Sequence, residues 1–181
     1  MKSLAASPCR QDTPPRRRPI LFRLPPSSFI LPPVRSITSI HIAAPRERIF
    51  ACVSDLARWP VLLPHYRYIR DLGAGERGRI LEMSATRSGI PITWVSDYWA
   101  DPRALELHFM HLRHWTKGMK VVWTLTPTRD GTRVEIVHEL KFRVPLLAWP
   151  TEFIINAAFI HPIAARTLAT FKAHLEGKDE G

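Results

Sequence analysis

Residues 40–66, IHIAAPRERIFACVSDLARWPVLLPHY, decide the fold that the sequence predicts. They begin in a short β-branched strand, which we place at Ile37–Ala43. Pro45 is typical of the first turn of a helix, and the pairs Trp59-Pro60 and Leu63-Pro64 end that helix in an irregular turn. Between them, apolar residues at the i, i+3, i+4 and i+7 positions mark one helical face: Ile49, Cys52, Val53 and Leu56.

Six further strands are predicted downstream of this turn. They are separated by short turn-forming sequences, namely Gly73-Ala74-Gly75, Ser88-Gly89, Asp101-Pro102 and Asp130-Gly131. Because the connections are short, neighbouring strands are expected to pair antiparallel. The predicted strands cover Arg67–Leu72, Arg77–Thr86, Ile90–Asp101, Ala104–Leu112, Lys117–Pro127 and Thr132–Arg143.

The last predicted element is a helix over Thr151–Glu176. Pro162 lies inside this pattern and is expected to kink the helix or split it in two. The order of strand, helix, six strands and helix indicates an α+β domain with its helices on one face of an antiparallel sheet. The apolar face of the closing helix repeats about every four residues: Phe159, Ile163, Thr167, Leu168, Phe171 and Leu175.

The length of 181 residues suits one domain with its own core. Residues 1–35 carry seven basic side chains, one acidic side chain and eight of the 17 prolines, so most of the net charge of +10 lies there. We expect residues 1–35 to be a disordered or polyproline-like tail, residues 36–177 to be the domain, and residues 178–181 to be a flexible C-terminus. The domain itself is only mildly basic, so nucleic acid is not an expected partner.

Two further features bear on the class of protein. The two cysteines, Cys9 and Cys52, do not suggest a disulfide framework or a metal cluster. No run of 18 apolar residues is present, and Arg23, Pro25 and Pro26 interrupt the apolar stretch at residues 20–31. We therefore expect a cytoplasmic protein without a membrane span.

Three segments together resemble the START-like superfamily, also called SRPBCC, and its polyketide cyclase/dehydrase and lipid-transport members. They are residues 40–66, quoted above, TWVSDYWADPRALELHF (93–109) and MKVVWTLTPTRDGTRVEIVHEL (119–140). With the closing helix, the resemblance covers Ser36 to Gly177. It implies a helix-grip fold, in which a curved sheet of about seven strands wraps a long C-terminal helix around a cavity. Aromatase/cyclases are the nearest likeness, and coenzyme-Q-binding proteins are a second. No cofactor is implied.

Strand alternation predicts which side chains would face such a cavity. One face of four predicted strands is mostly apolar, with polar groups only at Ser96, Tyr98, His111 and His138. An apolar wall with few polar groups fits a small-molecule site. A core filled by side chains would give the same periodicity as a wall around a cavity. The resemblance to the START-like superfamily favours the cavity. The predicted ligand-binding residues are Trp94, Ser96, Tyr98, Leu107, Phe109, Met119, Val121, Trp123, Ile136 and Phe159.

Two residues are candidates for catalysis. Tyr66 follows the Pro64 turn, where the resemblance to cyclases implies a tyrosine near the cavity, and a phenol can donate a hydrogen bond or act as a weak acid. His138 can act as a general acid or base because histidine titrates near neutral pH. The alternatives are packing for Tyr66 and a hydrogen-bonded core position for His138. Ser96 matches a serine of those cyclases, whereas Tyr98 stands where they carry an arginine, which favours binding or a different substrate.

The sequence gives little support for a metal site or for the common catalytic and nucleotide-binding motifs. His108, His111 and His114 are spaced by three, and on a strand the first two point to opposite faces, so no metal site is expected. The sequence contains no G-x-G-x-x-G, Walker A, G-x-S-x-G or C-x-x-C motif. Four residues could form a lid or make transient membrane contact, or could only pack the helix onto the sheet: Trp115, Lys117, Trp149 and Phe153.

Three functions follow from these patterns. The first is a carrier or binding protein for an apolar or aromatic small molecule, such as a polyketide, quinone or lipid. The alternative is an aromatase/cyclase or dehydratase acting on a poly-β-ketone, with Tyr66 or His138 moving protons. The third is an interaction module in which the basic tail binds an acidic partner or nucleic acid.

Overall fold

The computed structural model describes residues 34–113, 116–140 and 160–177, all within the compact unit Leu31–Gly181. Its elements, in chain order, are β1 (Val34–Ile42), α1 (Arg46–Ser54), a 3₁₀ turn η1 (Leu56–Arg58), α2 (Trp59–Leu62), β2 (Tyr66–Ala74), β3 (Arg79–Arg87), β4 (Ile90–Asp101), β5 (Glu106–His111), β6 (Lys120–Thr128), β7 (Gly131–Leu140) and α4 (His161–Leu175).

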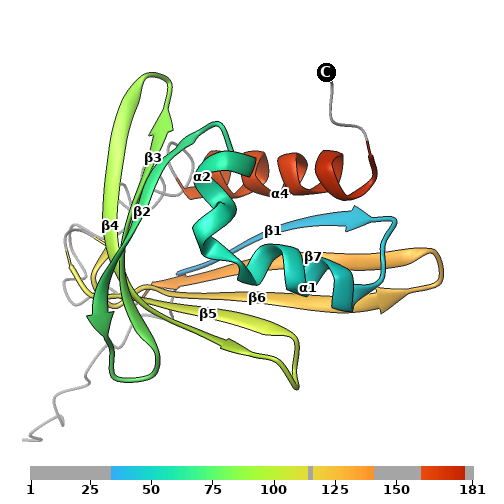
Figure 1. Cartoon of the computed structure of the whole chain (residues 1–181), viewed down its shortest axis with the longest axis horizontal. Coiled ribbons are helices and arrows are strands. Elements are labelled where there is room, and N and C mark those ends of the chain that lie inside the picture. Colours follow the sequence, from blue (N-terminus) through green and yellow to red (C-terminus); the bar gives the residue numbers. More distant parts are fainter. Residues whose placement is uncertain (1–33, 114–115, 141–159, 178–181) are drawn as a thin grey trace, which may run out of the picture. The chain divides into compact units, whose positions relative to one another are not determined.

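The seven strands form one antiparallel sheet in the order β1-β7-β6-β5-β4-β3-β2. Strands β2 to β7 pair with their sequence neighbours, and β1 returns to pair with β7. Figure 1 shows that the sheet bends near β4, which pairs with β3 along its first part and with β5 along its last part, and that α1, α2 and α4 lie inside the bend. The predicted α+β helix-grip fold is confirmed.

Alternation along β6 and β7 explains why the inner face is apolar. Val121 and Trp123 of β6 are buried, and they pair in register with His138 and Ile136 of β7. The intervening residues, such as Glu135, face away from this core. The hairpin between the two strands needs glycine at Gly131, because a Cβ there would collide with the backbone at Ile42.

The strand boundaries differ from the sequence prediction at a few turns. β1 begins at Val34, two residues before the predicted start of the domain. β5 begins at Glu106 rather than Ala104, because Leu105 adopts a left-handed backbone with φ of 57° and cannot extend the strand. β4 covers the predicted range Ile90–Asp101. Residues 141–143 of the last predicted strand lie outside the described residues.

The closing helix α4 is described from His161, and Pro162 lies in its first turn, where proline is tolerated. The predicted helical residues 151–159, Phe159 among them, lie outside the described part of the chain. The buried face of α4 follows the predicted spacing at Ala164, Thr167, Leu168, Phe171 and Leu175. Among residues 34–113, 116–140 and 160–177, no helix has both the length and the apolar character needed to cross a membrane.

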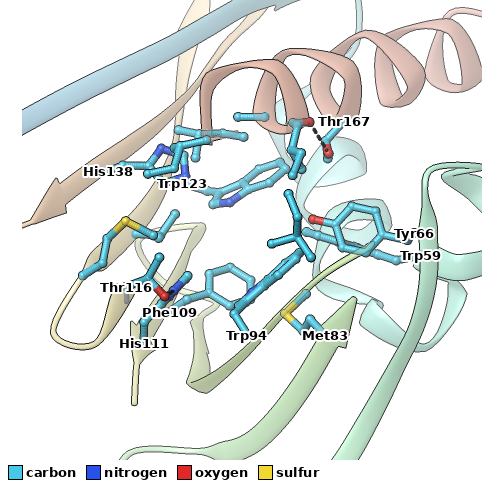
Figure 2. A pocket seen from close by; sticks show the side chains of 17 residues that line it. Trp59, Tyr66, Met83, Trp94, Phe109, His111, Thr116, Trp123, His138 and Thr167 are labelled. Atoms are coloured by element: carbon cyan, nitrogen blue, oxygen red, sulfur yellow. Dashed lines mark hydrogen bonds between the residues drawn. The ribbon is translucent and has the colours of Figure 1, made fainter. Parts of the chain in front are cut away.

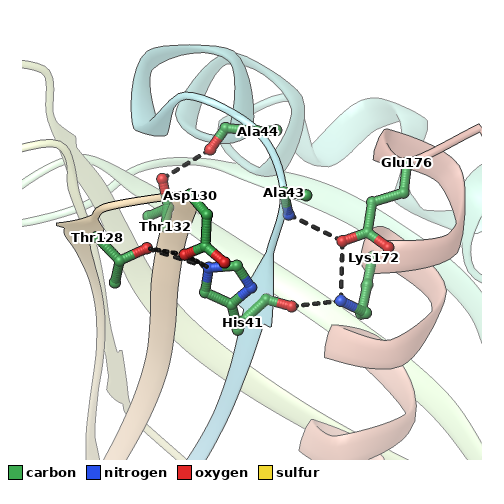
Figure 3. A network of polar contacts seen from close by, with 8 residues as sticks. All are labelled: His41, Ala43, Ala44, Thr128, Asp130, Thr132, Lys172 and Glu176. Carbon is green, nitrogen blue, oxygen red and sulfur yellow. Dashed lines mark hydrogen bonds and ion pairs between the residues drawn. The ribbon is translucent and has the colours of Figure 1, made fainter.

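Polar contacts hold the end of α4 against the end of β1 (Figure 3). Lys172 Nζ donates to the His41 carbonyl oxygen at 2.6 Å and lies 2.8 Å from Glu176 Oε1. The same carboxylate oxygen accepts a hydrogen bond from the Ala43 amide at 2.8 Å. These contacts attach the C-terminal end of α4 to β1. The N-terminal half of α4, which carries Ala164 and Thr167, lies over the inner face of the sheet.

Trp59 lies at the centre of the core. Its side chain is 1% exposed, and its indole N–H donates to the Val53 carbonyl oxygen at 3.0 Å. Its ring centroid lies 5.2 Å from Tyr66, 5.5 Å from Trp123 and 5.6 Å from Phe171. The short helix α2 therefore brings the sheet and α4 together through one aromatic side chain.

Candidate ligand cavity

A cavity of about 90 Å³ lies between the inner face of the sheet, α2 and α4 (Figure 2). One water molecule needs about 10–15 Å³ on the same scale, so there is room for several waters or a small guest. Seventeen of the described residues line it: Trp59, Tyr66, Met83, Ile92, Trp94, Phe109, His111, Thr116, Met119, Val121, Trp123, Ile136, His138, Ile160, Ile163, Ala164 and Thr167.

Aromatic rings form much of this wall. Trp94 of β4 lies with its ring centroid 6.0 Å from Tyr66 and 6.3 Å from His111, and it is nearly parallel to the histidine. Trp59 and Phe109 continue the wall, with centroids 6.4 Å apart. Flat aromatic surfaces of this kind suit a guest that is itself apolar or aromatic.

Two histidines supply polar atoms to the wall. Burial lowers the pKa of His111 to about 3, with a smaller contribution from His138. Burial, together with His161, lowers the pKa of His138 to about 4. Both imidazoles are therefore neutral at pH 7. His111 Nδ1 lies 2.8 Å from the Thr116 hydroxyl, whereas His138 Nδ1 is buried and has no hydrogen-bond partner among the described residues.

The opposite wall carries Tyr66 and Thr167. Burial raises the pKa of Tyr66 far above its ordinary value, and a hydrogen bond with Thr167 opposes the rise only in part, so the phenol keeps its proton at neutral pH. The Thr167 hydroxyl donates to the Ile163 carbonyl oxygen at 2.8 Å. It therefore accepts from Nε2 of His65, 2.9 Å away. The wall can thus offer hydrogen bonds from neutral groups.

Most of the residues predicted from the sequence as binding or catalytic do line the cavity. Six predicted binding residues are among its lining, and so are the two catalytic candidates, Tyr66 and His138. Their roles in binding or catalysis remain predictions. The six are Trp94, Phe109, Met119, Val121, Trp123 and Ile136.

Three predicted binding residues, Ser96, Tyr98 and Leu107, are not among the residues that line this cavity. Tyr98 lies under α1, where its hydroxyl donates to the Ser54 carbonyl oxygen at 3.2 Å. Leu107 is fully buried in the core. Ser96 is also fully buried, and its hydroxyl has no hydrogen-bond partner in the part of the chain that the structure describes. All three are on the strand face that alternation predicts, but α1 and the core cover that part of the sheet. Phe159 lies outside the described residues.

Several lining residues were missed by the sequence analysis. The sequence predicts Trp59 only as part of an irregular turn, and no pattern in it singles out Met83 or Thr116. Ile163 and Thr167 stood on the predicted apolar face of the closing helix, so their four-residue spacing could have identified them.

The histidines on β5 point to opposite faces, as predicted. His111 lies in the cavity wall, whereas His108 stacks on Trp99 at a centroid distance of 4.9 Å and lies 3.2 Å from Glu106. Within the part of the chain that the structure describes, no three metal-ligating side chains gather. Of the four residues considered for a lid or membrane contact, only Lys117 is described, and it is exposed.

Comparison with known proteins gives a family match over most of the chain. Residues 34–176 match the family described as polyketide cyclase/dehydrase and lipid transport. This range contains every described strand and helix.

Two curated proteins illustrate the match. The granaticin polyketide synthase bifunctional cyclase/dehydratase of Streptomyces violaceoruber is 33% identical over 112 residues, which are 61% of this chain and 34% of that protein. A putative polyketide cyclase of Streptomyces cyaneus is 29% identical over 108 residues, 58% of this chain and 70% of that protein. The chain thus spans about a third of the length of the first relative.

Solved structures share the fold at lower identity. The Zhui aromatase/cyclase from Streptomyces sp. R1128 superposes with a TM-score of 0.67 at 14% identity, covering 82% of this chain and 97% of that one. A START superfamily protein from Mycobacterium smegmatis gives a TM-score of 0.54 at 21% identity, covering 80% and 95%.

Proposed function

The chain belongs to the polyketide cyclase/dehydrase and lipid transport family, and from that premise we propose that it binds an apolar or aromatic small molecule inside its cavity. A polyketide, a quinone and a lipid are the candidate ligand classes. The proposed role is that of a carrier or binding protein. Affinity would come mainly from burial of apolar ligand surface, at about 25 cal/mol per Å² before the costs of association.

One observation carries this proposal: the described wall of the cavity is mostly aromatic and aliphatic, with a few neutral polar side chains, among them the imidazole of His138. Apolar ligand surface is stabilised by burial against such a wall, and a single polar atom of the ligand can form a hydrogen bond with a neutral polar side chain. A ligand with one polar atom beside the His138 ring and an apolar body against Trp94 and Trp123 would match both parts of the wall. The cavity therefore favours an apolar molecule with a polar end.

The protonation states favour binding over proton transfer. An efficient general base has a pKa near the working pH, whereas that of His138 is lowered to about 4. Tyr66 holds its proton tightly and is a correspondingly weak acid. These neutral groups suit the orientation of a guest better than they suit chemistry on it.

The second candidate function is an aromatase/cyclase or dehydratase acting on a poly-β-ketone. It is supported by the relative of 33% identity that is named as a cyclase/dehydratase. In this case the cavity would hold a flexible chain in one reactive conformation, and positioning would supply much of the rate gain. Tyr66 would donate a hydrogen bond to a ketone oxygen as negative charge develops on it.

Native mass spectrometry of the purified chain, followed by calorimetric titration with 2-naphthol, tests the proposal. We expect a co-purified apolar molecule, and after its removal we expect 2-naphthol to bind. His138→Phe should weaken 2-naphthol binding about tenfold, the value of one hydrogen bond. The matched variant Tyr98→Phe removes a hydroxyl outside the cavity. It should change the affinity by less than twofold, which corresponds to less than about 0.4 kcal/mol of binding free energy.

The two functions separate in their outcomes. Absence of both a co-purified molecule and 2-naphthol binding contradicts the proposed binding function. Conversion of a poly-β-ketone thioester by the wild type, but not by Tyr66→Phe, would establish the enzymatic alternative.

A further inference from the structure

The cavity wall has an unusual charge composition. Of the lining residues in the described parts of the chain, none is lysine, arginine, aspartate or glutamate. The polar side chains that line it are the neutral or neutralisable ones of Tyr66, His111, Thr116, His138 and Thr167. On the wall formed by residues 34–113, 116–140 and 160–177, a guest meets hydrogen-bonding atoms without a fixed positive or negative charge.

We infer that the buried end of the ligand is uncharged and that this cavity rejects a free carboxylate group. The inference rests on the proposed binding function and narrows its substrate class. Phenols, ketones, esters, thioesters and amides keep a polar atom without a charge and remain admissible. A free fatty acid or another free carboxylic acid, bound head-first, is excluded.

The geometry also places the ligand's polar end. Figure 2 shows His138, His111 and Thr116 on one side of the cavity and Tyr66 and Thr167 on the other. On the second side, the Thr167 hydroxyl is already engaged with Ile163 and His65. The first side carries two neutral imidazoles and one hydroxyl group, from His138, His111 and Thr116. We place the polar atom of the guest on this side, beside the His138 ring, with its apolar body extending towards Tyr66.

The histidines cannot readily supply the missing positive charge. Burial disfavours the protonated form of both His111 and His138. Electrostatic repulsion adds to this effect, from His138 on His111 and from His161 on His138. A carboxylate would have to lose its hydration and force protonation of one of them. A buried ion pair made in this way repays its desolvation only when its geometry and its remaining hydrogen bonds are very good.

A set of naphthalene probes of matched shape tests the inference on the purified full chain at pH 7.5. Calorimetric titration is made with 2-naphthol, with 2-naphthamide and with 2-naphthoate, the last two being nearly isosteric and differing in charge. We expect 2-naphthol and 2-naphthamide to bind and 2-naphthoate to bind at least about 100-fold more weakly than the amide, because its charge would be buried without a partner.

The outcomes separate the two proposals. Failure of 2-naphthol to bind overturns the proposed function, and this inference with it. Binding of 2-naphthol together with similar affinities for amide and carboxylate overturns only the inference, and so does rejection of both. A stronger affinity for the carboxylate overturns it as well.

A substitution in the cavity wall tests whether charge, rather than ligand shape, excludes the carboxylate. Ile92 lines the cavity and is only partly buried, so a lysine at this position places a positive charge at the cavity wall while its ammonium group stays partly hydrated. Ile92→Lys should raise the affinity for 2-naphthoate about tenfold or more relative to the matched variant Ile92→Met. Equal rejection of 2-naphthoate by the two folded variants would contradict a charge-based exclusion.

Discussion

Nε2 of His65 lies 2.9 Å from the hydroxyl oxygen of Thr167, across a sequence separation of 102 residues. His65 precedes β2 and is 2% exposed, while Thr167 faces the cavity from α4. Because the threonine gives its proton to the Ile163 carbonyl oxygen, the histidine is the donor in this contact. One hydroxyl group thus joins the closing helix to the sheet and forms part of the ligand wall.

Removing this hydroxyl should destabilise the protein. Thr167→Val preserves the shape of the side chain but leaves the buried Nε2–H of His65 without its acceptor. Nδ1 of the same ring already lacks a partner within residues 34–113, 116–140 and 160–177. We expect the free energy of unfolding to fall by about 1–3 kcal/mol, as measured by urea denaturation.

Thr170→Val is the matched control for this change. Thr170 lies on the same helix and makes the same kind of bond to the carbonyl four residues earlier, at Arg166, but in an exposed position. Its loss should cost less than about 0.5 kcal/mol. Equal losses for the two variants would show that the contact with His65 contributes nothing.

Trp59 should be the most sensitive position of the core. Trp59→Ala removes a ring that packs against Tyr66, Trp123 and Phe171 and leaves a large void. We expect a loss of about 3–5 kcal/mol in the free energy of unfolding. Val61→Ala on the same short helix, where the side chain is 84% exposed, should change it by less than about 0.5 kcal/mol. A tolerated Trp59→Ala would contradict the central place given to this residue.

The buried histidines should make stability depend on pH. Burial lowers the pKa values of His65 and His138 to about 4 and that of His111 to about 3. Between pH 6.5 and 4 the unfolded chain therefore binds protons that the folded chain does not. Stability should fall as the pH is lowered through this window, by up to about 1.4 kcal/mol per pH unit for each histidine.

Urea denaturation at pH 7.5, 6.5 and 5.5 measures this dependence. The decrease in the free energy of unfolding between pH 6.5 and pH 5.5 should be smaller in His65→Gln than in the wild type, because one of the three buried imidazoles is absent. A free energy of unfolding that is constant or rises as the pH falls would exclude the neutral, buried state of these side chains.

The periodicity of the strands predicted much of the site. Alternation correctly placed Trp94, Phe109 and Trp123 on the inner face, and these side chains do line the cavity. Alternation reports only which face a residue occupies, not what covers it. Tyr98 and Leu107 share that face but lie beneath α1 and within the core, because the sheet bends and its inner face is filled along part of its length.

Contacts between distant segments left no signal in the sequence. The position of Trp59 depends on the helix that follows a broken turn, and its partners come from strands and a helix far along the chain. The same holds for the pair of His65 and Thr167. Local patterns predicted the elements and their faces, whereas the empty volume depends on how the bend and α4 meet, which no local pattern records.

The measurement that tests the cavity most directly is calorimetric titration of 2-naphthol into the wild type and into a variant in which the cavity is filled. Ala164 is buried in the cavity wall, whereas Ala169 is exposed on the same helix. Ala164→Leu should abolish binding and keep or raise stability, because added methyl groups occupy empty space. Ala169→Leu should bind as the wild type does. Undiminished binding by a folded Ala164→Leu variant would contradict a ligand site at this position.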